Sequence, residues 1–198
     1  MNLSINTLLS TEEVQEVTTL YKEVFGESNW EEGKKCTSCG KKYRLSEAPA
    51  ICCAVAPVDF YSDAEVASGI KQAMANTGFQ IVRLFTPNPS GFAWGWQNTL
   101  EEINNAKLGI KPDDLCAIGA EDSRWFYLSE LGVRASARGQ GYGRLLLGTL
   151  LATLPKNIPT ILRTSTRSEL FSLIKKEQFS TVYAYGDEDD RILSVRPA

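Results

Sequence analysis

Histidine is absent from this sequence of 198 residues. The Ser-His-Asp and Cys-His catalytic arrangements need an imidazole, which is also the commonest metal ligand. The absence therefore excludes those classes of site. Any general base in this chain has to be a carboxylate, a tyrosine, a thiolate, an amine or a water molecule.

The sequence also lacks the features of several locations and partners. It contains no run of about 18 apolar residues, so a membrane-spanning helix is not expected. Its net charge of -3 gives no electrostatic reason to expect nucleic acid as a partner. Residues 1–6 do not have the basic start and apolar stretch of a signal peptide. We therefore expect a cytoplasmic protein without a membrane or nucleic-acid partner.

The hydrophobic and charged patterns are those of one globular domain spanning residues 1–198. Periodicity predicts a strand over 3–9, helices over 11–26 and 62–76, a hairpin of 79–85 with 92–96, and a helix over 99–108. A connection over 109–122 follows. The remaining predictions are a strand over 127–133, a helix over 145–154, a strand over 158–163, a helix over 165–176, and a closing hairpin of 179–185 with 191–195.

A glycine-rich loop joins the strand that ends at Val133 to the leucine-rich helix. Glycines at such a junction let the backbone approach a bulky anion, and the first N–H groups of the helix then point at it. A dinucleotide fingerprint fails because Arg144 and Leu146 stand where its third glycine is needed. A Walker-type phosphate loop fails because Thr149 stands in place of the lysine.

The pattern Arg138-x-x-Gly141-x-Gly143, with its strand before and helix after, resembles the acyl-CoA signature of the GCN5-related N-acetyltransferases, Q/R-x-x-G-x-G/A. The resemblance extends to the element order of nearly the whole chain. It implies an α/β (α+β) acyl-CoA N-acyltransferase fold, with a central mixed, mostly antiparallel sheet of about six to seven strands and about four flanking helices. Residues 127–154 would be the acyl-CoA-binding strand, loop and helix, and residues 27–50 depart from the family as an inserted loop.

The resemblance implies acetyl-CoA as the co-substrate. Main-chain groups of Leu131 and Val133 would hold the pantetheine amides. The pyrophosphate would lie on the loop, assisted by the guanidinium of Arg138. The loop residues implied in cofactor binding are Arg138, Gly139, Gln140, Gly141, Tyr142, Gly143 and Arg144.

The implied reaction is direct attack of a primary amine, in a small molecule or peptide, on the thioester. The N–H of Leu131 would stabilise the oxyanion, and Glu130 is the candidate base because apolar Leu128 and Leu131 flank it. The other interpretation of Glu130 is a charged side chain on a solvent-facing strand. The family's general-acid tyrosine corresponds to Ile174 here, which leaves a protonation by solvent or by one of three other tyrosines, Tyr142, Tyr183 and Tyr185.

Five cysteines, an odd number, argue against a disulfide framework. The spacing Cys36-x-x-Cys39-Gly40 resembles one zinc-ribbon knuckle, so Cys36 and Cys39 are candidate zinc ligands. Cys52 and Cys53 are the only later pair nearby, and adjacent residues of an extended strand point to opposite faces. Plain burial of reduced cysteines is the alternative.

The insert lies between the first two helices, a position that borders the acceptor in this family, so Trp30, Cys36 and Cys39 are expected to shape the acceptor pocket. The competing hypothesis for the whole protein is a non-catalytic acyl-CoA-binding domain or a zinc-stabilised interaction domain.

Overall fold

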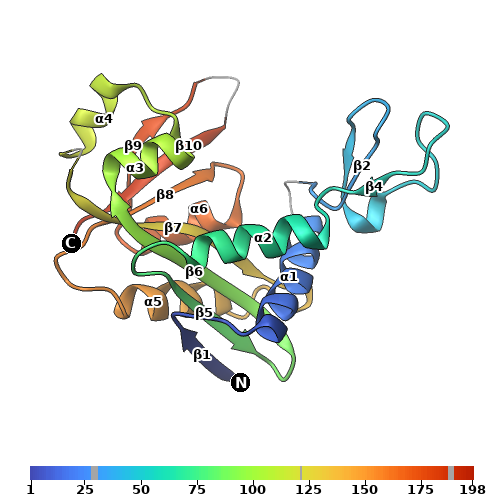
Figure 1. Cartoon of the computed structure of the whole chain (residues 1–198), viewed down its shortest axis with the longest axis horizontal. Helices are drawn as coiled ribbons and strands as arrows, with labels where there is room; N and C mark the ends of the chain where they lie inside the picture. Colours follow the sequence, from blue (N-terminus) through green and yellow to red (C-terminus); the bar gives the residue numbers. More distant parts are fainter. Residues whose placement is uncertain (28–30, 121, 187–189) are drawn as a thin grey trace.

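A computed structural model of the chain describes residues 1–27, 31–120, 122–186 and 190–198. Its centre is a seven-stranded sheet in the order β1-β5-β6-β7-β8-β10-β9 (Figure 1). Neighbouring strands are antiparallel except β7 and β8, which are parallel. The strands are β1 (Asn2–Asn6), β5 (Gln80–Phe85), β6 (Pro89–Thr99), β7 (Arg124–Val133), β8 (Thr160–Ser165), β9 (Ser180–Ala184) and β10 (Arg191–Arg196).

The described residues form six α-helices beside the sheet: α1 (Thr11–Gly26), α2 (Asp63–Met74), α3 (Leu100–Ile103), α4 (Pro112–Ile118), α5 (Tyr142–Ala152) and α6 (Glu169–Lys176). Three of them begin with a capping box, at Ser10, Ser62 and Thr99. In each, the hydroxyl accepts a hydrogen bond from the backbone N–H of a glutamate three positions later, and the carboxylate of that glutamate accepts one from the backbone N–H of the capping residue. A single π-helical turn, η2 (Asn104–Leu108), continues α3. Among the described helices, none combines the length and apolar character of a membrane span.

Each face of the sheet has its own buried core. On one face Phe92, Trp94 and Trp96 pack with apolar residues of α1 to α4. On the other face Ala93 and Phe126 pack with α5 and α6. This alternation along β6 follows from the two-residue period of a strand. Phe92, Trp94 and Trp96 therefore share one face of the sheet, and their packing is that of a core.

Leu146 lies in the middle of the second core and is completely buried. Replacing Leu146 with alanine removes apolar contacts between α5 and the sheet and leaves a cavity. We expect the free energy of unfolding to fall by about 2–5 kcal/mol, measured by urea denaturation. Replacing exposed Leu8 with alanine is the control, and an equal loss in both variants would contradict this description of the core.

The inserted segment forms a small second sheet in the order β3-β2-β4, which projects from the main body (Figure 1). Its strands are β2 (Lys34–Lys35), β3 (Lys42–Tyr43) and β4 (Val58–Asp59), with the 3-10 turn η1 (Leu45–Glu47) between β3 and β4. The predicted insert of 27–50 therefore belongs to a structural unit that continues to Asp59. Trp30 lies outside the described residues.

Two sequence-based boundaries were wrong. The connection predicted over 109–122 contains α4, which begins with Pro112 at its first position and acids in its first turn, both helix-start signals. The helix predicted from residue 165 begins at Glu169. Ser165 is occupied in a turn, since its hydroxyl donates to Asp190 at 2.6 Å and accepts from the Arg167 N–H at 3.0 Å.

Candidate active site

The two central strands of the main sheet separate halfway along β7. Within the described residues, β7 pairs with β8 only at Phe126 with Thr160 and at Tyr127 with Ile161. On its other edge β7 remains paired with β6 as far as Val133. The sheet therefore opens on one side of β7 from about Leu128 onward.

The main-chain groups of Leu131 and Val133 face this opening. The Arg134 N–H donates to the Ser90 carbonyl on β6 at 2.8 Å. Along an antiparallel strand, every second residue directs its N–H and C=O to the same neighbour. Arg134 directs its N–H to β6, so Val133 and Leu131, one and three residues earlier, direct their main-chain groups to the opposite edge of β7. The carbonyl of Val133 accordingly accepts a hydrogen bond from Arg138 Nε, at 3.1 Å.

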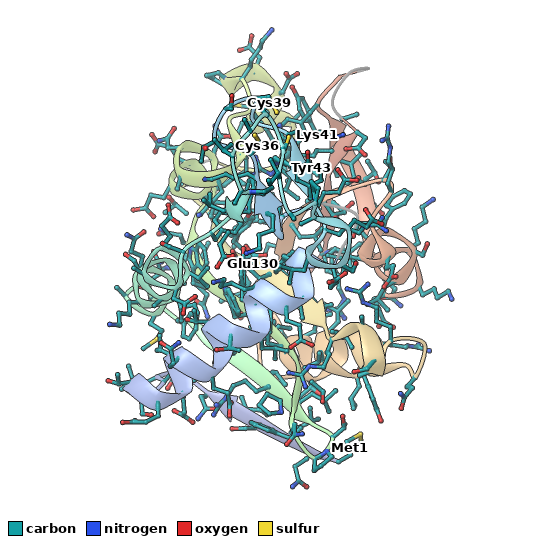
Figure 2. The ribbon with its side chains drawn as sticks, turned by 90° about the vertical axis from the view of Figure 1, so that its right-hand side faces the viewer. Met1, Cys36, Cys39, Lys41, Tyr43 and Glu130 are labelled. Carbon is teal, nitrogen blue, oxygen red and sulfur yellow. The ribbon has the colours of Figure 1, made fainter. Side chains whose placement is uncertain are left out.

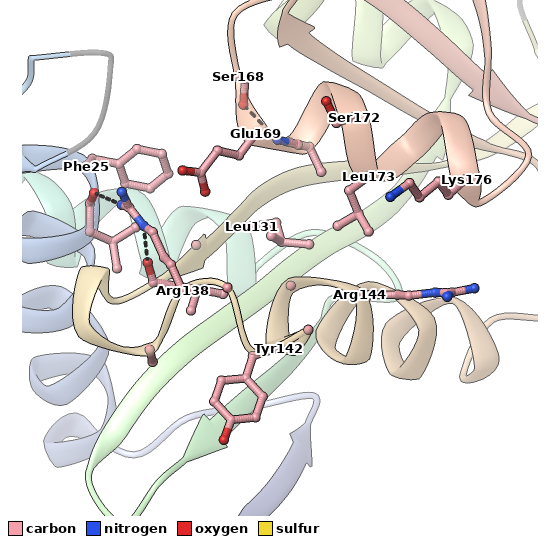
Figure 3. Close-up of a pocket in the computed structure, with 18 residues that line it drawn as sticks. Phe25, Leu131, Arg138, Tyr142, Arg144, Ser168, Glu169, Ser172, Leu173 and Lys176 are labelled. Atoms are coloured by element: carbon pink, nitrogen blue, oxygen red, sulfur yellow. Dashed lines mark hydrogen bonds between the residues drawn. The ribbon is translucent and has the colours of Figure 1, made fainter.

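A cleft of about 430 Å³ lies along this open edge, between the end of α1, the glycine-rich loop and α6 (Figure 3). Leu131 and Val133 contribute to its floor, and the side chains of Glu169 and Lys176 reach it from α6. It is lined by both apolar and charged groups, which suits a long ligand that carries polar amides and a charged end. Six of the seven sequence-predicted cofactor residues of the loop line it as well: Arg138, Gly139, Gly141, Tyr142, Gly143 and Arg144.

The loop has the backbone geometry that its glycines allow. Gly139 has a φ of 75° and Gly141, the N-cap of α5, a φ of 79°, both in the left-handed region. A Cβ added to either glycine would meet no protein atom within 4 Å, so the loop surface there is open to a ligand. In the part of the chain that the structure describes, no side chain caps α5, which leaves its first N–H groups for an anion.

The longer side chains of the loop have contacts of their own or face solvent. The guanidinium of Arg138 donates to the carbonyls of Val133 and, at 3.3 Å, Val24, which ties the loop to α1 (Figure 3). Arg144 Nε donates to Glu177 at 2.7 Å. The ring of Tyr142 points away from α6, and Gln140 is exposed.

A β-bulge decides where Glu130 points. Trp94 pairs with Glu130, and the next residue of β6, Gly95, pairs with Leu128, which leaves Ser129 as the extra residue of β7. Without the bulge Glu130 would share a face with Leu128. With it, Leu128 packs toward α5, whereas Glu130 shares the face of Trp94, under α1 and α2.

Glu130 is half-buried in an acidic and aromatic environment. Burial is the main cause that raises its pKa to about 8, and the charge of Glu32 adds to it. Lys107 and Arg163 oppose this shift. The predicted flank of Leu128 and Leu131 was the wrong cause for a raised pKa, since their side chains pack toward the opposite face of the sheet.

Three aromatic residues and a second acid, none of them predicted as site residues, complete this face. The ring of Tyr21 lies 6.2 Å from that of Tyr61 and 5.9 Å from that of Trp94. The Tyr61 hydroxyl donates to Glu32, and burial raises the pKa of Glu32. Tyr21 belonged to a helix stripe that fits a core equally well, and Glu32 lies in an aperiodic segment, so the sequence carried no signal for either residue.

The position expected for a general-acid tyrosine is a core position. Ile174 is 1% exposed and packs in the second core.

The predicted zinc ligands Cys36 and Cys39 lie together at the far end of the small sheet, apart from Glu130 (Figure 2). The structure brings Cys52 and Cys53 to the same place, whereas Cys116 lies in α4.

No protein-family model matches the sequence, and no curated protein matches it. Solved structures match over the full length. PH1933 from Pyrococcus horikoshii OT3 is 15% identical, covering 100% of this chain and 99% of its own, with a TM-score of 0.60. PaiA N-acetyltransferase from Thermoplasma acidophilum, solved with coenzyme A, is 14% identical over 100% of both chains, with a TM-score of 0.57. NAA60 from Arabidopsis thaliana, solved with acetyl-CoA, is 12% identical over 99% of this chain and 98% of its own, with a TM-score of 0.57. The chain therefore has the mixed α/β acyl-CoA N-acyltransferase fold that the sequence predicted.

Proposed function

We propose that this protein is an acyl-CoA-dependent N-acyltransferase that moves acetyl from acetyl-CoA to a primary amine of a small molecule or peptide. The observation that carries the proposal is the gap between β7 and β8. A cleft of about 430 Å³ opens on it, the main chain of Leu131 and Val133 faces it, and Glu130 stands on the opposite face of the same strand. Donor and acceptor would thus meet at the gap from the two faces of the sheet.

The donor would be held mostly by main-chain groups. The pantetheine amides would bond the main chain of Leu131 and the N–H of Val133, since Arg138 already uses the Val133 carbonyl. The pyrophosphate would lie on the N–H groups of Gly139, Gly141, Gly143 and Arg144, at the uncapped start of α5. Gln140 and Tyr142 would border it.

In the reaction, Glu130 takes a proton from the acceptor ammonium, directly or through water, and the amine nitrogen attacks the thioester carbon. The carbonyl oxygen becomes an oxyanion, which the N–H of Leu131 stabilises. Collapse of the tetrahedral intermediate breaks the C–S bond and forms the amide, as the nitrogen gives up its second proton to solvent. Coenzyme A leaves as a thiolate and is protonated by solvent, which suits an acidic leaving group and the core position of Ile174.

The alternative is a non-catalytic acyl-CoA-binding domain, and the missing tyrosine is the observation that favours it. Calorimetric titration with acetyl-CoA, together with the release of coenzyme A thiol across a broad panel of amines, separates the two. We expect binding and amine-dependent thiol release. Binding without release for any amine would instead support the non-catalytic domain.

Zinc is the metal we propose for Cys36 and Cys39, because two thiolates separated by two residues, with a glycine after them, suit one tetrahedral ion. The ion would be structural and would take no part in acyl transfer. Among the described residues, Cys36, Cys39, Cys52 and Cys53 are not joined by disulfides, which suits the reducing cytoplasm that we propose as the location.

A further inference from the structure

The inserted unit contains a cluster of four cysteine sulfurs. The Sγ atoms of Cys36, Cys39, Cys52 and Cys53 all lie within 4.8 Å of one another. The Cys39 and Cys52 sulfurs are 3.8 Å apart, and so are those of Cys52 and Cys53. A Zn–S bond of about 2.3 Å in a tetrahedron puts neighbouring sulfurs about 3.8 Å apart. A disulfide requires about 2.05 Å.

We propose that these four cysteines bind one zinc ion in a closed tetrathiolate site, and that this ion orders the inserted unit. The inserted unit in turn places Glu32 near Glu130. The first part stands on the cysteine geometry alone. The second part rests on the proposed acetyltransferase function.

The first knuckle is held by its own backbone. The N–H of Gly40 donates to the Cys36 carbonyl at 2.9 Å, and the N–H of Cys36 donates to the Lys41 carbonyl at 2.9 Å. Gly40 has a φ of 74°, which permits the tight turn. The N–H groups of Cys39 and Ser38 hydrogen-bond the Cys36 thiol. Backbone N–H groups that point at a sulfur stabilise it as a thiolate ligand.

The second knuckle uses an unusual turn to bring adjacent cysteines together. Cys52 and Val55 exchange hydrogen bonds of 2.8 and 2.9 Å, so residues 52–55 close a two-residue hairpin. Its central residues, Cys53 and Ala54, have φ angles of 50° and 63°. Such a turn is ordinarily made by Asn-Gly, and non-glycine residues there are strained. The turn bends the chain where an extended strand would have sent the two sulfurs apart.

Plain burial does not account for this cluster. Cys39 and Cys53 are exposed, whereas a structural cysteine without a ligand is usually buried. The surroundings also suit a metal–thiolate centre. Four thiolates and one zinc ion carry a net negative charge, and the lysines at 34, 35, 41 and 42 supply positive charge around it. The hydroxyl of Tyr43 donates to the Cys52 sulfur at 3.0 Å, as an outer-shell partner does.

The inserted unit has little else to hold it. Among the described residues of 31–60, Cys36 is the only buried apolar side chain. Its strands are two residues long. A unit of this size without an apolar core needs a metal or a disulfide for independent order. The end of the unit near the main body is fixed to α1, since Asp59 on β4 pairs with Lys22 on α1 at 2.9 Å. Asp59 also pairs with Lys34 on β2, at 2.5 Å.

β2 connects the cysteine cluster to the acceptor side. Cys36 follows β2 directly, and Gly33 and Glu32 precede it. Gly33 donates to the Tyr43 carbonyl and accepts from the Phe60 N–H, both at 3.1 Å, so it continues the small sheet toward Glu130. At about 3.3 Å per residue, Cys36 and Glu32 are about 13 Å apart along the strand. The ion would therefore act on Glu32 by fixing the register of β2.

Elemental analysis of protein purified without added zinc tests the ligand set. We expect one zinc ion per chain in the wild type and in Cys116→Ala, and a loss of most of it in Cys36→Ala and Cys53→Ala. Cys53→Ala is the decisive variant, because a three-cysteine site would retain its metal. Stoichiometric iron, or a wild-type protein with no metal and with its cysteines paired as disulfides, would overturn the proposal.

Variants that fail to fold do not decide the ligand set, so the wild type is also reconstituted with cobalt after chelation. Four thiolate ligands predict the absorption bands of tetrahedral Co²⁺ with sulfur-to-metal charge transfer. Bands of an octahedral, oxygen-bound ion would contradict the site.

Hydrogen exchange on the chelated wild type tests the role of the ion. We expect protection to fall at least tenfold at β2, β3 and β4 and to stay unchanged at β7. Acetyl-CoA affinity should stay within twofold, and the KM for the amine should rise. Unchanged exchange in the small sheet would overturn the ordering role. If no amine is acetylated, the proposed function fails, while the metal and exchange results still decide the zinc site.

Discussion

Replacing Glu130 with glutamine is expected to lower kcat by about 10²- to 10⁴-fold, the range that general acid–base catalysis contributes. Glutamine keeps the size of the side chain but cannot accept the proton of the acceptor ammonium. The affinity for acetyl-CoA should not change, because the donor cleft is built from the main chain of β7, the glycine-rich loop and α6. Steady-state kinetics with a reactive amine, together with calorimetry for acetyl-CoA, measure the two effects separately.

The pH dependence of the same variant identifies the group. Glu130 accepts a proton only in its ionised form, and its pKa in the folded protein is raised to about 8 by burial and by Glu32. In the wild type, kcat/KM for the amine should rise with pH through about 8 and then level off. The variant should lose this midpoint.

The stability of the wild-type fold should fall with rising pH, whereas its activity should rise. Because the folded state raises the pKa from 4.5 to about 8, it favours neutral Glu130. That contribution is fully present below pH 4.5 and is lost as the pH rises through 8. The Glu130→Gln variant cannot ionise, so its Tm relative to wild type should increase across this interval.

The control is Glu101→Gln, an exposed carboxylate at the start of α3, which should match the wild type in activity, pH profile and Tm. Full turnover and an unchanged pH midpoint in Glu130→Gln would show that another group removes the proton.

The sequence was sufficient to predict the glycine-rich loop and the helix after it because their determinants are local. The glycines at 139 and 141 are needed by backbone angles of their own residues, and the helix after them is defined by its leucine period. The order of strands and helices then indicated the fold. The need for glycine in this loop comes from the φ angles of the loop itself, so it can be read from the sequence without knowing the tertiary structure.

The surroundings of Glu130 and the grouping of the cysteines could not be predicted because their determinants are tertiary. The bulge at Ser129 is a mismatch between β7 and β6, so it has no local signature, yet it moves Glu130 from the face of Leu128 to that of Trp94. Glu32 joins the site only through pairing within the small sheet. The sulfur of Cys53 reaches Cys52 and Cys39 through a turn whose residues are not those that usually form it.

Replacing Gly141 with alanine is expected to raise the Kd for acetyl-CoA at least about tenfold, which corresponds to about 1.4 kcal/mol. Gly141 caps α5 with a φ of 79°, and its Cα faces open space in the protein. A methyl group there would stand where the pyrophosphate has to approach the backbone. The left-handed conformation also costs alanine about 1–2 kcal/mol, so Tm should fall slightly.

Gly148 provides the matched control, because it lies on the same helix and an added Cβ would also meet nothing within 4 Å. Its helical backbone suits alanine, so Gly148→Ala should stabilise the protein by about 0.5–1 kcal/mol and leave the Kd for acetyl-CoA unchanged. Calorimetry well below the lower Tm separates binding from folding. Equal affinity in both variants, with only Gly141→Ala destabilised, would mean that the glycines serve a turn and that the donor phosphates bind elsewhere. A loss of affinity confined to Gly141→Ala, measured where both variants are folded, would assign the start of α5 to the pyrophosphate, because both changes add the same methyl group and only that at Gly141 faces the loop surface.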